Sequence, residues 1–201
     1  MADHYYSKKP QTASKPKSWS ATLRDELFQF ETDTGVFSKS EVDFGSRVLI
    51  DAFVMPVTEG PVLDVGCGYG PIGLSIAKTD ANRTIHMVDI NERAVQLSRK
   101  NAEVNGVQNV RIYESDGFTE VTETDFAAIL TNPPIRAGKQ TIFRFYLDAY
   151  TKLCVGGELW VVIQKKQGAP STFDRLEETF GQVEVVDKVR GYWIIKAEKV
   201  K

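Results

Sequence analysis

Cysteine and histidine are scarce in this chain of 201 residues, which contains two of each. Two cysteines are too few for a disulfide framework, and with two histidines we expect no metal site. Long hydrophobic runs are also absent: none approaches the ~20 residues of a membrane-spanning helix. The first residues lack the apolar core of a signal peptide. We therefore expect a cytoplasmic protein with no membrane association.

An excess of charge of one sign is missing as well, because 25 basic residues stand against 27 acidic ones, a net charge of −2. This balance argues against a protein that coats nucleic acid, although a local basic face is still possible. The hydrophobic share of 42% and the charged share of 26% are ordinary for a globular chain. The length predicts one domain, with a core large enough to be stable without a disulfide or a structural metal. We expect a monomer.

The first 22 residues are polar and basic and show no periodicity. They predict a flexible N-terminal arm over 1–22, followed by a single domain over 23–201. The apolar pattern from Leu23 to Phe30 predicts a short strand. Apolar residues at helical spacing predict a helix over 42–55, which Pro56 ends.

After Gly60, predicted strands and helices alternate. Short apolar runs predict strands over 62–65, 84–88, 110–113, 126–130 and 159–163, and amphipathic patterns predict helices over 72–78, 92–104, 139–154 and 173–180. Strands separated by helices indicate a Rossmann-like, doubly wound, mostly parallel sheet. The last two segments, 183–189 and 192–197, meet at a tight turn and predict an antiparallel edge. The fold class is therefore α/β with about seven strands.

A glycine-rich turn follows the strand over 62–65 and reads DVGCGYG over residues 64–70. Alternate glycines let a ligand lie against bare backbone, and open parallel sheets bind ligands at this edge. From Gly68 the sequence fits G-x-G-x-x-G, with Asp89 about 20 residues on, as in NAD-binding enzymes. The frame that begins at Asp64 favours a cationic ligand, because a carboxylate at the strand end repels a pyrophosphate and attracts an ammonium group.

Acidic residues also end the next two strands, at Asp89 and Asp116. A single acid at a strand end is an ordinary solvated residue. Three acids at three successive strand ends beside a glycine loop favour a binding site.

The strand over 126–130 leads into Asn132-Pro133-Pro134-Ile135. Proline fixes its own φ and restricts the residue before it, so the Asn132 amide and the Pro133 carbonyl are held rigidly. Two acceptors placed in this way bind the two hydrogens of an exocyclic amine and turn its lone pair toward an electrophile. Methyl transfer then depends on alignment and electrostatics. We predict that Asn132, Pro133 and Pro134 are the catalytic residues.

These motifs resemble those of known methyltransferases. The pattern that starts at Asp64 resembles motif I of the Rossmann-like enzymes that use S-adenosylmethionine, and residues 132–135 resemble the Asn-Pro-Pro-(Tyr/Phe) motif of amino-group methyltransferases. With the segments 32–39, 43–46 and 100–106, the chain from Phe30 onward resembles the RsmC-like MTS family, which methylates N2 of guanine in small-subunit ribosomal RNA.

The resemblance implies S-adenosylmethionine as cofactor. In it Asp64 faces the methionine end, Asp89 binds the ribose hydroxyls and Asp116 binds the adenine amine. The implied cofactor-binding residues are Asp64, Gly66, Cys67, Gly68, Gly70, Asp89, Ile90, Asp116, Gly117 and Asn132. The implied partner is ribosomal RNA, the 16S molecule, or the small ribosomal subunit.

Two departures keep other acceptors open. Ile135 stands where the motif has an aromatic residue, and the chain matches only the catalytic half of longer family members. A protein glutamine, an adenine or a small molecule is the alternative acceptor, and an NAD-dependent oxidoreductase is a further alternative.

Basic residues collect in the segment from Arg136 to Lys166, with six bases against two acids. Four of them follow strands and are expected to contact RNA phosphates: Arg136, Lys139, Lys165 and Lys166. Phe37 is expected to close over the cofactor or to stack on the target base, with a place in the core as the alternative, and Ile135 is expected beside that base. The base must be unpaired or flipped out because a paired guanine amine is inaccessible.

Overall fold

The computed structural model of the protein describes residues 13–36, 38, 40–134 and 138–201. The predicted substrate-binding residues Phe37, Ile135 and Arg136 lie outside these ranges, as does the side chain of Lys139. In the described ranges, no helix is long and apolar enough to cross a membrane.

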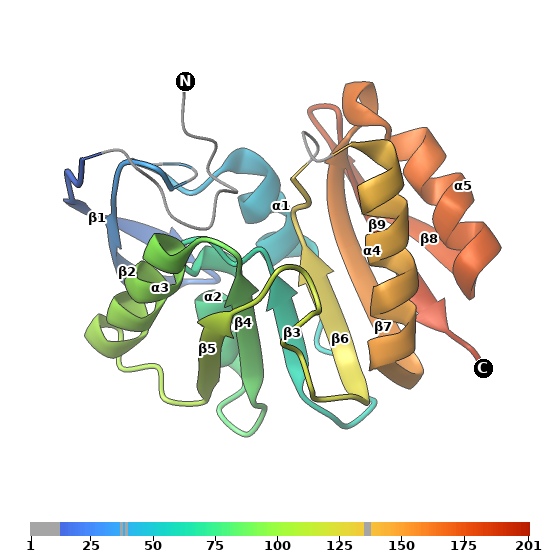
Figure 1. Cartoon of the computed structure of the whole chain (residues 1–201), viewed down its shortest axis with the longest axis horizontal. Coiled ribbons are helices and arrows are strands. Elements are labelled where there is room, and N and C mark those ends of the chain that lie inside the picture. Colours follow the sequence, from blue (N-terminus) through green and yellow to red (C-terminus); the bar gives the residue numbers. More distant parts are fainter. Residues whose placement is uncertain (1–12, 37, 39, 135–137) are drawn as a thin grey trace.

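A seven-stranded sheet forms the centre of the molecule, with strand order β5-β4-β3-β6-β7-β9-β8 (Figure 1). The strands are β3 (Val62–Val65), β4 (Ile85–Asp89), β5 (Val110–Glu114), β6 (Phe126–Thr131), β7 (Leu153–Gln164), β8 (Gly181–Val189) and β9 (Tyr192–Lys199). The helices are α1 (Phe44–Ala52), α2 (Pro71–Thr79), α3 (Glu92–Val104), α4 (Lys139–Lys152) and α5 (Ala169–Phe180). The predicted α/β fold class is confirmed.

Strands β3 to β7 pair in parallel, whereas β9 pairs antiparallel with both β7 and β8. The antiparallel strand therefore lies one place in from the edge. The turn that joins β8 to β9 is the predicted Arg190-Gly191, with positive φ at both residues (47° and 83°). This is the turn conformation that matches the twist of two antiparallel strands.

Each face of the sheet buries its own hydrophobic core, because side chains alternate along a strand. On β3, Val62 packs with α1, α2 and α3, whereas Leu63 packs with α4 and α5. Strands β3 and β6 are buried along their whole length. This explains why their sequences are continuously apolar apart from Asp64 and Thr131.

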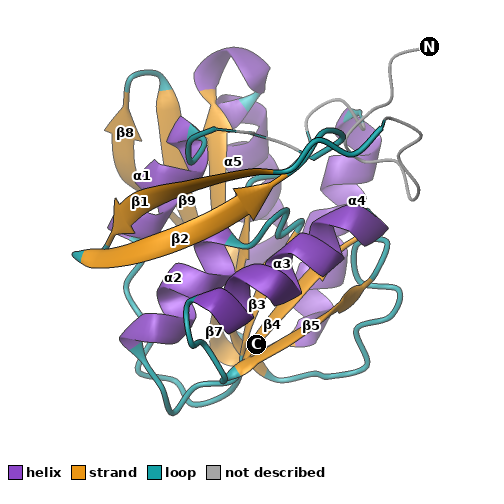
Figure 2. Ribbon diagram, turned by 90° about the vertical axis from the view of Figure 1, so that its left-hand side faces the viewer, coloured by secondary structure: helices purple, strands orange, loops and turns teal. Residues whose placement is uncertain are grey.

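The N-terminal region differs from the prediction. Strands β1 (Lys17–Leu23) and β2 (Glu26–Thr32) form an antiparallel hairpin that lies beside α3 (Figure 2). The predicted arm over 1–22 is therefore wrong for residues 17–22, and the single short strand predicted from Leu23 to Phe30 is two strands. Trp19 and Phe30 pack against Tyr69 of the glycine loop (ring centroids at 5.8 and 5.4 Å), which gives the hairpin a buried face.

Candidate functional site

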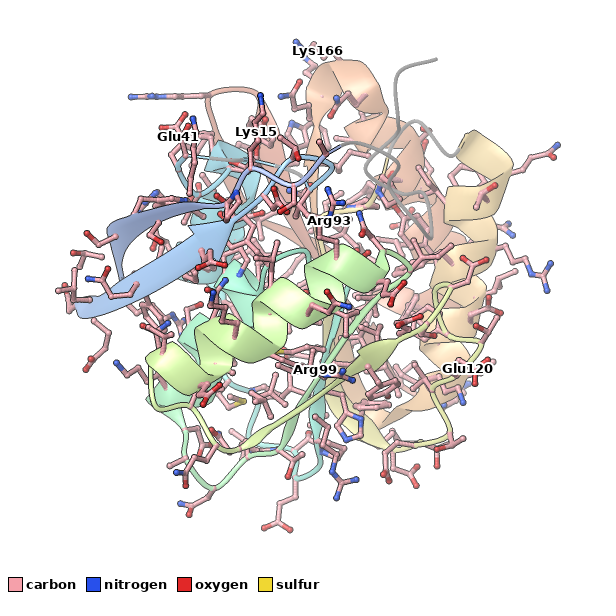
Figure 3. The ribbon with its side chains drawn as sticks, turned by 60° about the vertical axis from the view of Figure 1, so that its left-hand side comes forward. Lys15, Glu41, Arg93, Arg99, Glu120 and Lys166 are labelled. Carbon is pink, nitrogen blue, oxygen red and sulfur yellow. The ribbon has the colours of Figure 1, made fainter. Side chains whose placement is uncertain are left out.

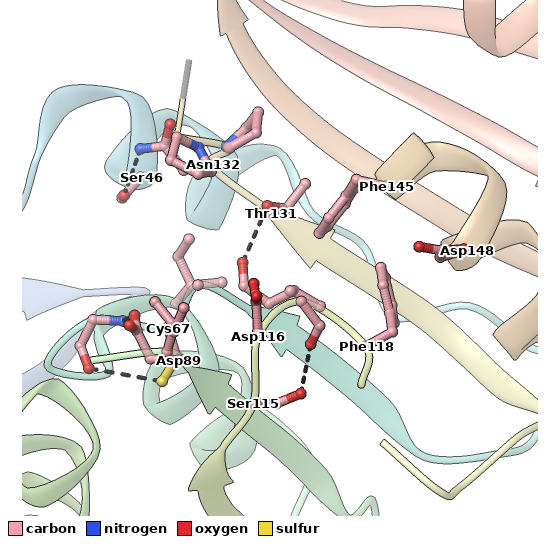
Figure 4. Close-up of a pocket in the computed structure, with 18 of the residues that line it drawn as sticks. Ser46, Cys67, Asp89, Ser115, Asp116, Phe118, Thr131, Asn132, Phe145 and Asp148 are labelled. Carbon is pink, nitrogen blue, oxygen red and sulfur yellow. Dashed lines mark hydrogen bonds between the residues drawn. The ribbon is translucent and has the colours of Figure 1, made fainter. Parts of the chain in front are cut away.

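A cavity of about 690 Å³ opens at the carboxyl ends of β3, β4, β5 and β6 (Figure 4). Cavities of this size suit a ligand larger than a single base. Ten of the predicted site residues line it: Gly66, Cys67, Gly68, Asp89, Ile90, Asp116, Gly117, Asn132, Pro133 and Pro134. Residues from four different strand ends therefore meet at one place, as expected for an open parallel sheet.

The glycine loop presents bare backbone to the cavity. Gly66 and Gly68 have positive φ (78° and 58°), and a Cβ built on either would meet nothing within 4 Å. The amides of Gly66 and Cys67 both donate to the Val88 carbonyl (2.8 and 2.9 Å), which ties the loop to β4. A side chain at Gly66 or Gly68 would occupy the space that a ligand needs and strain the backbone.

Asp89 fixes the same loop and faces the cavity. Its Oδ2 accepts from the Gly68 amide and its Oδ1 from the Asn91 amide, both at 2.9 Å. Burial raises the pKa of Asp89, and the hydrogen bonds from these amides partly offset the rise because they stabilise the charged carboxylate. The Ile90 amide is a third donor to this carboxylate. Because a carboxylate has about four acceptor positions, Asp89 keeps capacity for a ligand hydroxyl.

The far end of the cavity combines two aromatic rings with charged side chains, among them Asp116 and Asp148 (Figure 4). Phe118 and Phe145 lie with ring centroids 4.9 Å apart, and Ile90 completes this wall. Asp116 stands exposed at the rim, beside Gly117. Such a slot takes a flat aromatic ring, with Asp116 available to an amino group on its edge.

Cys67 lines the cavity as a buried side chain, 3% exposed. Burial and the neighbouring carboxylates Asp89 and Asp64 raise the pKa of its thiol. The neutral thiol therefore serves as a small packing group and not as a nucleophile.

Two predicted cofactor-binding residues, Asp64 and Gly70, lie beneath the loop and not in the cavity wall. Asp64 is 1% exposed, and its Oδ2 accepts from the Gly73 amide at 2.9 Å. Gly70 is covered by Ser98 and Leu74. Both shape the loop from below, so a direct ligand contact by either has no support in this geometry. Lys165 does not line the cavity and is exposed directly after β7, at the same edge of the sheet.

The Asn132 amide is oriented by residues that precede it by more than 80 positions. Its Nδ2 donates to Asp43 Oδ2 at 2.9 Å and to Ser46 Oγ at 3.1 Å (Figure 4 shows the Ser46 contact). A carboxylate only accepts, so Asp43 fixes which way round the amide stands. Oδ1 of Asn132 is thereby left as an acceptor at the cavity.

Asp43 and Ser46 also build the start of α1. Asp43 is the N-cap residue, and its side chain accepts from the Ser46 amide at 3.1 Å. Its carboxylate thus joins the first turn of α1 to the end of β6. Sequence inspection placed residues 43–46 in the family pattern but gave no sign of this contact. Phe145 was missed too, because nothing in the pattern of α4 distinguishes a cavity-facing aromatic from a core one.

Comparison with known families matches residues 27–196 to a model described as Methyltransferase small domain. The chain is 59% identical over 201 residues to the uncharacterized protein YbxB of Bacillus subtilis, covering all of both chains. It is 34% identical over 185 residues to ribosomal RNA small subunit methyltransferase C of Escherichia coli, covering 90% of this chain and 52% of that protein. The chain therefore spans about half the length of this methyltransferase.

Among solved structures, a similar one is the T. thermophilus 16S rRNA N2 methyltransferase RsmC in complex with AdoMet and guanosine. It superposes with a TM-score of 0.81 at 28% identity, over 94% of this chain and 52% of that one. A TehB-like SAM-dependent methyltransferase from Corynebacterium glutamicum, at 18% identity and a TM-score of 0.60, shares the fold.

Proposed function

This chain belongs to the methyltransferase small domain family and is an S-adenosylmethionine-dependent methyltransferase, and we propose that its acceptor is the exocyclic amine N2 of a guanine in 16S ribosomal RNA. The family decides between the two cofactors that the glycine loop left open. The interpretation of that loop as a site for NAD is wrong.

The cavity fits the cofactor of the family. In our proposal the bare backbone at Gly66 and Gly68 admits it, Asp89 accepts from a hydroxyl of its ribose, and its adenine lies between Ile90 and Phe118 with the amino group toward Asp116. S-adenosylmethionine, when bound, supplies a methyl group on a positively charged sulfur. The thiol of Cys67 stays neutral and is a poor nucleophile. This agrees with direct transfer of the methyl group from the cofactor to the acceptor amine, which needs no nucleophile from the protein.

The orientation of the Asn132 amide carries the proposal. With Nδ2 held by Asp43 and Ser46, Oδ1 is available to accept one hydrogen of an amine. Pro133 has no N–H, so its backbone offers an acceptor only. Two acceptors side by side bind an –NH2 group and reject a ring carbonyl. This selects amine N2 of guanine over its oxygen O6.

The residues around Asn132 act by position. Holding both amine hydrogens would draw the nitrogen lone pair out of conjugation with the ring and direct it toward the methyl group of a bound cofactor. As the N–C bond formed, the S–C bond would break to leave a neutral thioether, and the amine would lose one proton to solvent. Alignment of this kind lowers the barrier without a covalent enzyme intermediate. The guanosine in the complex of the similar T. thermophilus enzyme supports a guanine over adenine or glutamine as the acceptor here.

The test is to replace Asn132 by alanine and to measure methylation of naked 16S rRNA and of small subunits from a deletion strain. We expect wild-type protein to form N2-methylguanosine, and Asn132→Ala to lower the rate about 100-fold, the usual cost of losing one preorganised group at a reaction centre. Affinity for S-adenosylmethionine should not change. Asn82→Ala, an exposed asparagine at the opposite edge of the sheet, is the matched control.

Nucleoside mass spectrometry separates the acceptors. Methyladenosine in the RNA would show that the acceptor is adenine and not guanine. A labelled methyl group on protein glutamine would show that the acceptor is a protein. Full activity of Asn132→Ala would contradict the catalytic role of the amide.

A further inference from the structure

Four exposed cations collect at the edge of the sheet where the cavity opens. Lys165 and Lys166 lie in the short 3₁₀ helix η2 (Lys165–Gln167) that follows β7, and Lys188 and Arg190 lie at the turn between β8 and β9. The Lys165 amide donates to the Gly191 carbonyl at 2.7 Å, which holds the two segments together. We call these four residues the cationic rim. Lys166 marks its position at the upper end of the molecule in Figure 3.

The charges of the cationic rim are not neutralised by the protein. None of the four forms an ion pair with an acidic side chain in the described part of the chain. Lys196, lower on the same sheet, shows the contrast: its Nζ contacts Glu184 at 2.7 Å and Glu158 at 3.4 Å. An unpaired cluster in a chain of net charge −2 is a local positive field, which favours an anionic partner.

Aromatic rings hold two of these cations in place. The guanidinium carbon of Arg190 lies 5.2 Å from the centre of the Phe44 ring, and Lys188 Nζ lies 4.0 Å from that of Trp193. Stacking on a ring orders a side chain without neutralising its charge, so both cations stay available. Phe44 in turn contacts Tyr192, at 5.5 Å between ring centroids, which fixes the turn against α1.

The cationic rim is linked to Asn132 through the first residues of α1. Phe44, under Arg190, follows Asp43, whose carboxylate accepts from Asn132. The sheet register shows how far the rim lies from Asn132. Thr131 pairs with Val161, which places Asn132 level with Val162 on β7. Lys165 follows three residues later, roughly 10 Å farther along the strand direction. The rim therefore stands just above the place where the acceptor amine is held.

We propose that the cationic rim binds the phosphate backbone of the RNA strand on either side of the methylated guanine. This inference rests on the proposed function and adds the path of the substrate to it. A base that reaches Asn132 must leave its helix or loop, so its flanking phosphates pass over the mouth of the cavity. Arg190 is suited to them, because a guanidinium binds two phosphate oxygens at once. Phosphate contacts position the strand without reading its sequence.

The test compares the double variant Lys166→Gln/Arg190→Gln with Arg111→Gln/Lys201→Gln. The control removes the same charge at the opposite edge of the sheet, where β5 begins and β9 ends. Affinity for a short, unstructured, labelled RNA that contains guanine is measured over a series of salt concentrations. Removing one cation that binds a phosphate of a single strand lowers the slope of log K against log salt by about 0.7, so the slope of the rim variant should fall by about 1.4. Its KM for RNA should rise, while its affinity for S-adenosylmethionine stays the same.

An unchanged salt slope in the rim variant, or an equal decrease in the control, would overturn the inference. If the protein binds polyglutamate as tightly as RNA, and the rim variant loses this binding, the rim is a site for an acidic polypeptide instead. A failure of the proposed function has a different result: the wild-type protein forms no N2-methylguanosine.

Discussion

Asp64 offers a direct measurement of what a buried carboxyl group does to the stability of this fold. It is 1% exposed, and while Oδ2 accepts from the Gly73 amide, Oδ1 has no hydrogen-bond partner among the described residues. Burial, with a smaller contribution from Asp89, raises the pKa of Asp64 to about 7, against the lowering effect of the Gly73 amide. The cause is the cost of removing a charge from water without a countercharge.

A folded-state pKa above the ordinary value of 3.8 means that the folded protein binds a proton that the unfolded chain has released. The stability due to this group is therefore full in acid and is lost as the pH rises through about 7. Between pH 5 and pH 8 we expect a loss on the order of 2–3 kcal/mol. Asp64→Asn keeps an acceptor for Gly73 but cannot ionise, so its stability lacks this dependence.

The assay is urea unfolding of the ligand-free protein and of Asp64→Asn at several pH values. The difference between their free energies of unfolding should shift by roughly 2–3 kcal/mol in favour of the variant from pH 5 to pH 8. A constant offset from the new amide group does not affect this slope. A pH-independent difference for Asp64→Asn would refute a carboxyl group destabilised by burial.

Substitutions at two further positions probe the contacts that support the site. Asp43→Ala should lower the methylation rate about tenfold, the equivalent of the hydrogen bond to a charged group that it removes, without changing cofactor affinity. Asp43→Asn should restore most of the rate because its oxygen accepts the same hydrogens; equal loss in both variants would contradict the positioning role. Gly73→Ala should destabilise the protein by roughly 1–3 kcal/mol in urea unfolding, since its Cβ would lie 2.6 Å from Met87 Cγ. A gain in stability would show that helix propensity outweighs this clash.

Most of the sheet could be predicted because its strands are buried and bounded by clear breakers. The helix over 92–104 has the predicted bounds, since Asn91 caps its start and Asn105-Gly106 ends it. The hairpin β1–β2 could not be found in this way. Its turn is Arg24-Asp25, both with positive φ (50° and 63°), where glycine or asparagine is the usual signal. The Arg24 side chain donates to the carbonyls of Ile50 and Phe53 at the end of α1. A tertiary contact therefore supports this turn, and no local pattern records it.

The two halves of the candidate site also differ in this way: one follows from local sequence and the other from a tertiary contact. The cofactor side depends on short segments at strand ends, and because parallel strands end at one edge, the sequence places Gly68, Asp89 and Asp116 together. The acceptor side depends on a contact between distant segments. The local sequence makes Asn132 rigid through Pro133, but a rigid amide with its NH2 group toward the cavity would repel an amine. Asp43 decides the orientation from 89 residues away. In the proposed function, the Asn-Pro-Pro element therefore depends on the packing of α1 against β7 and β9, which brings Asp43 to Asn132.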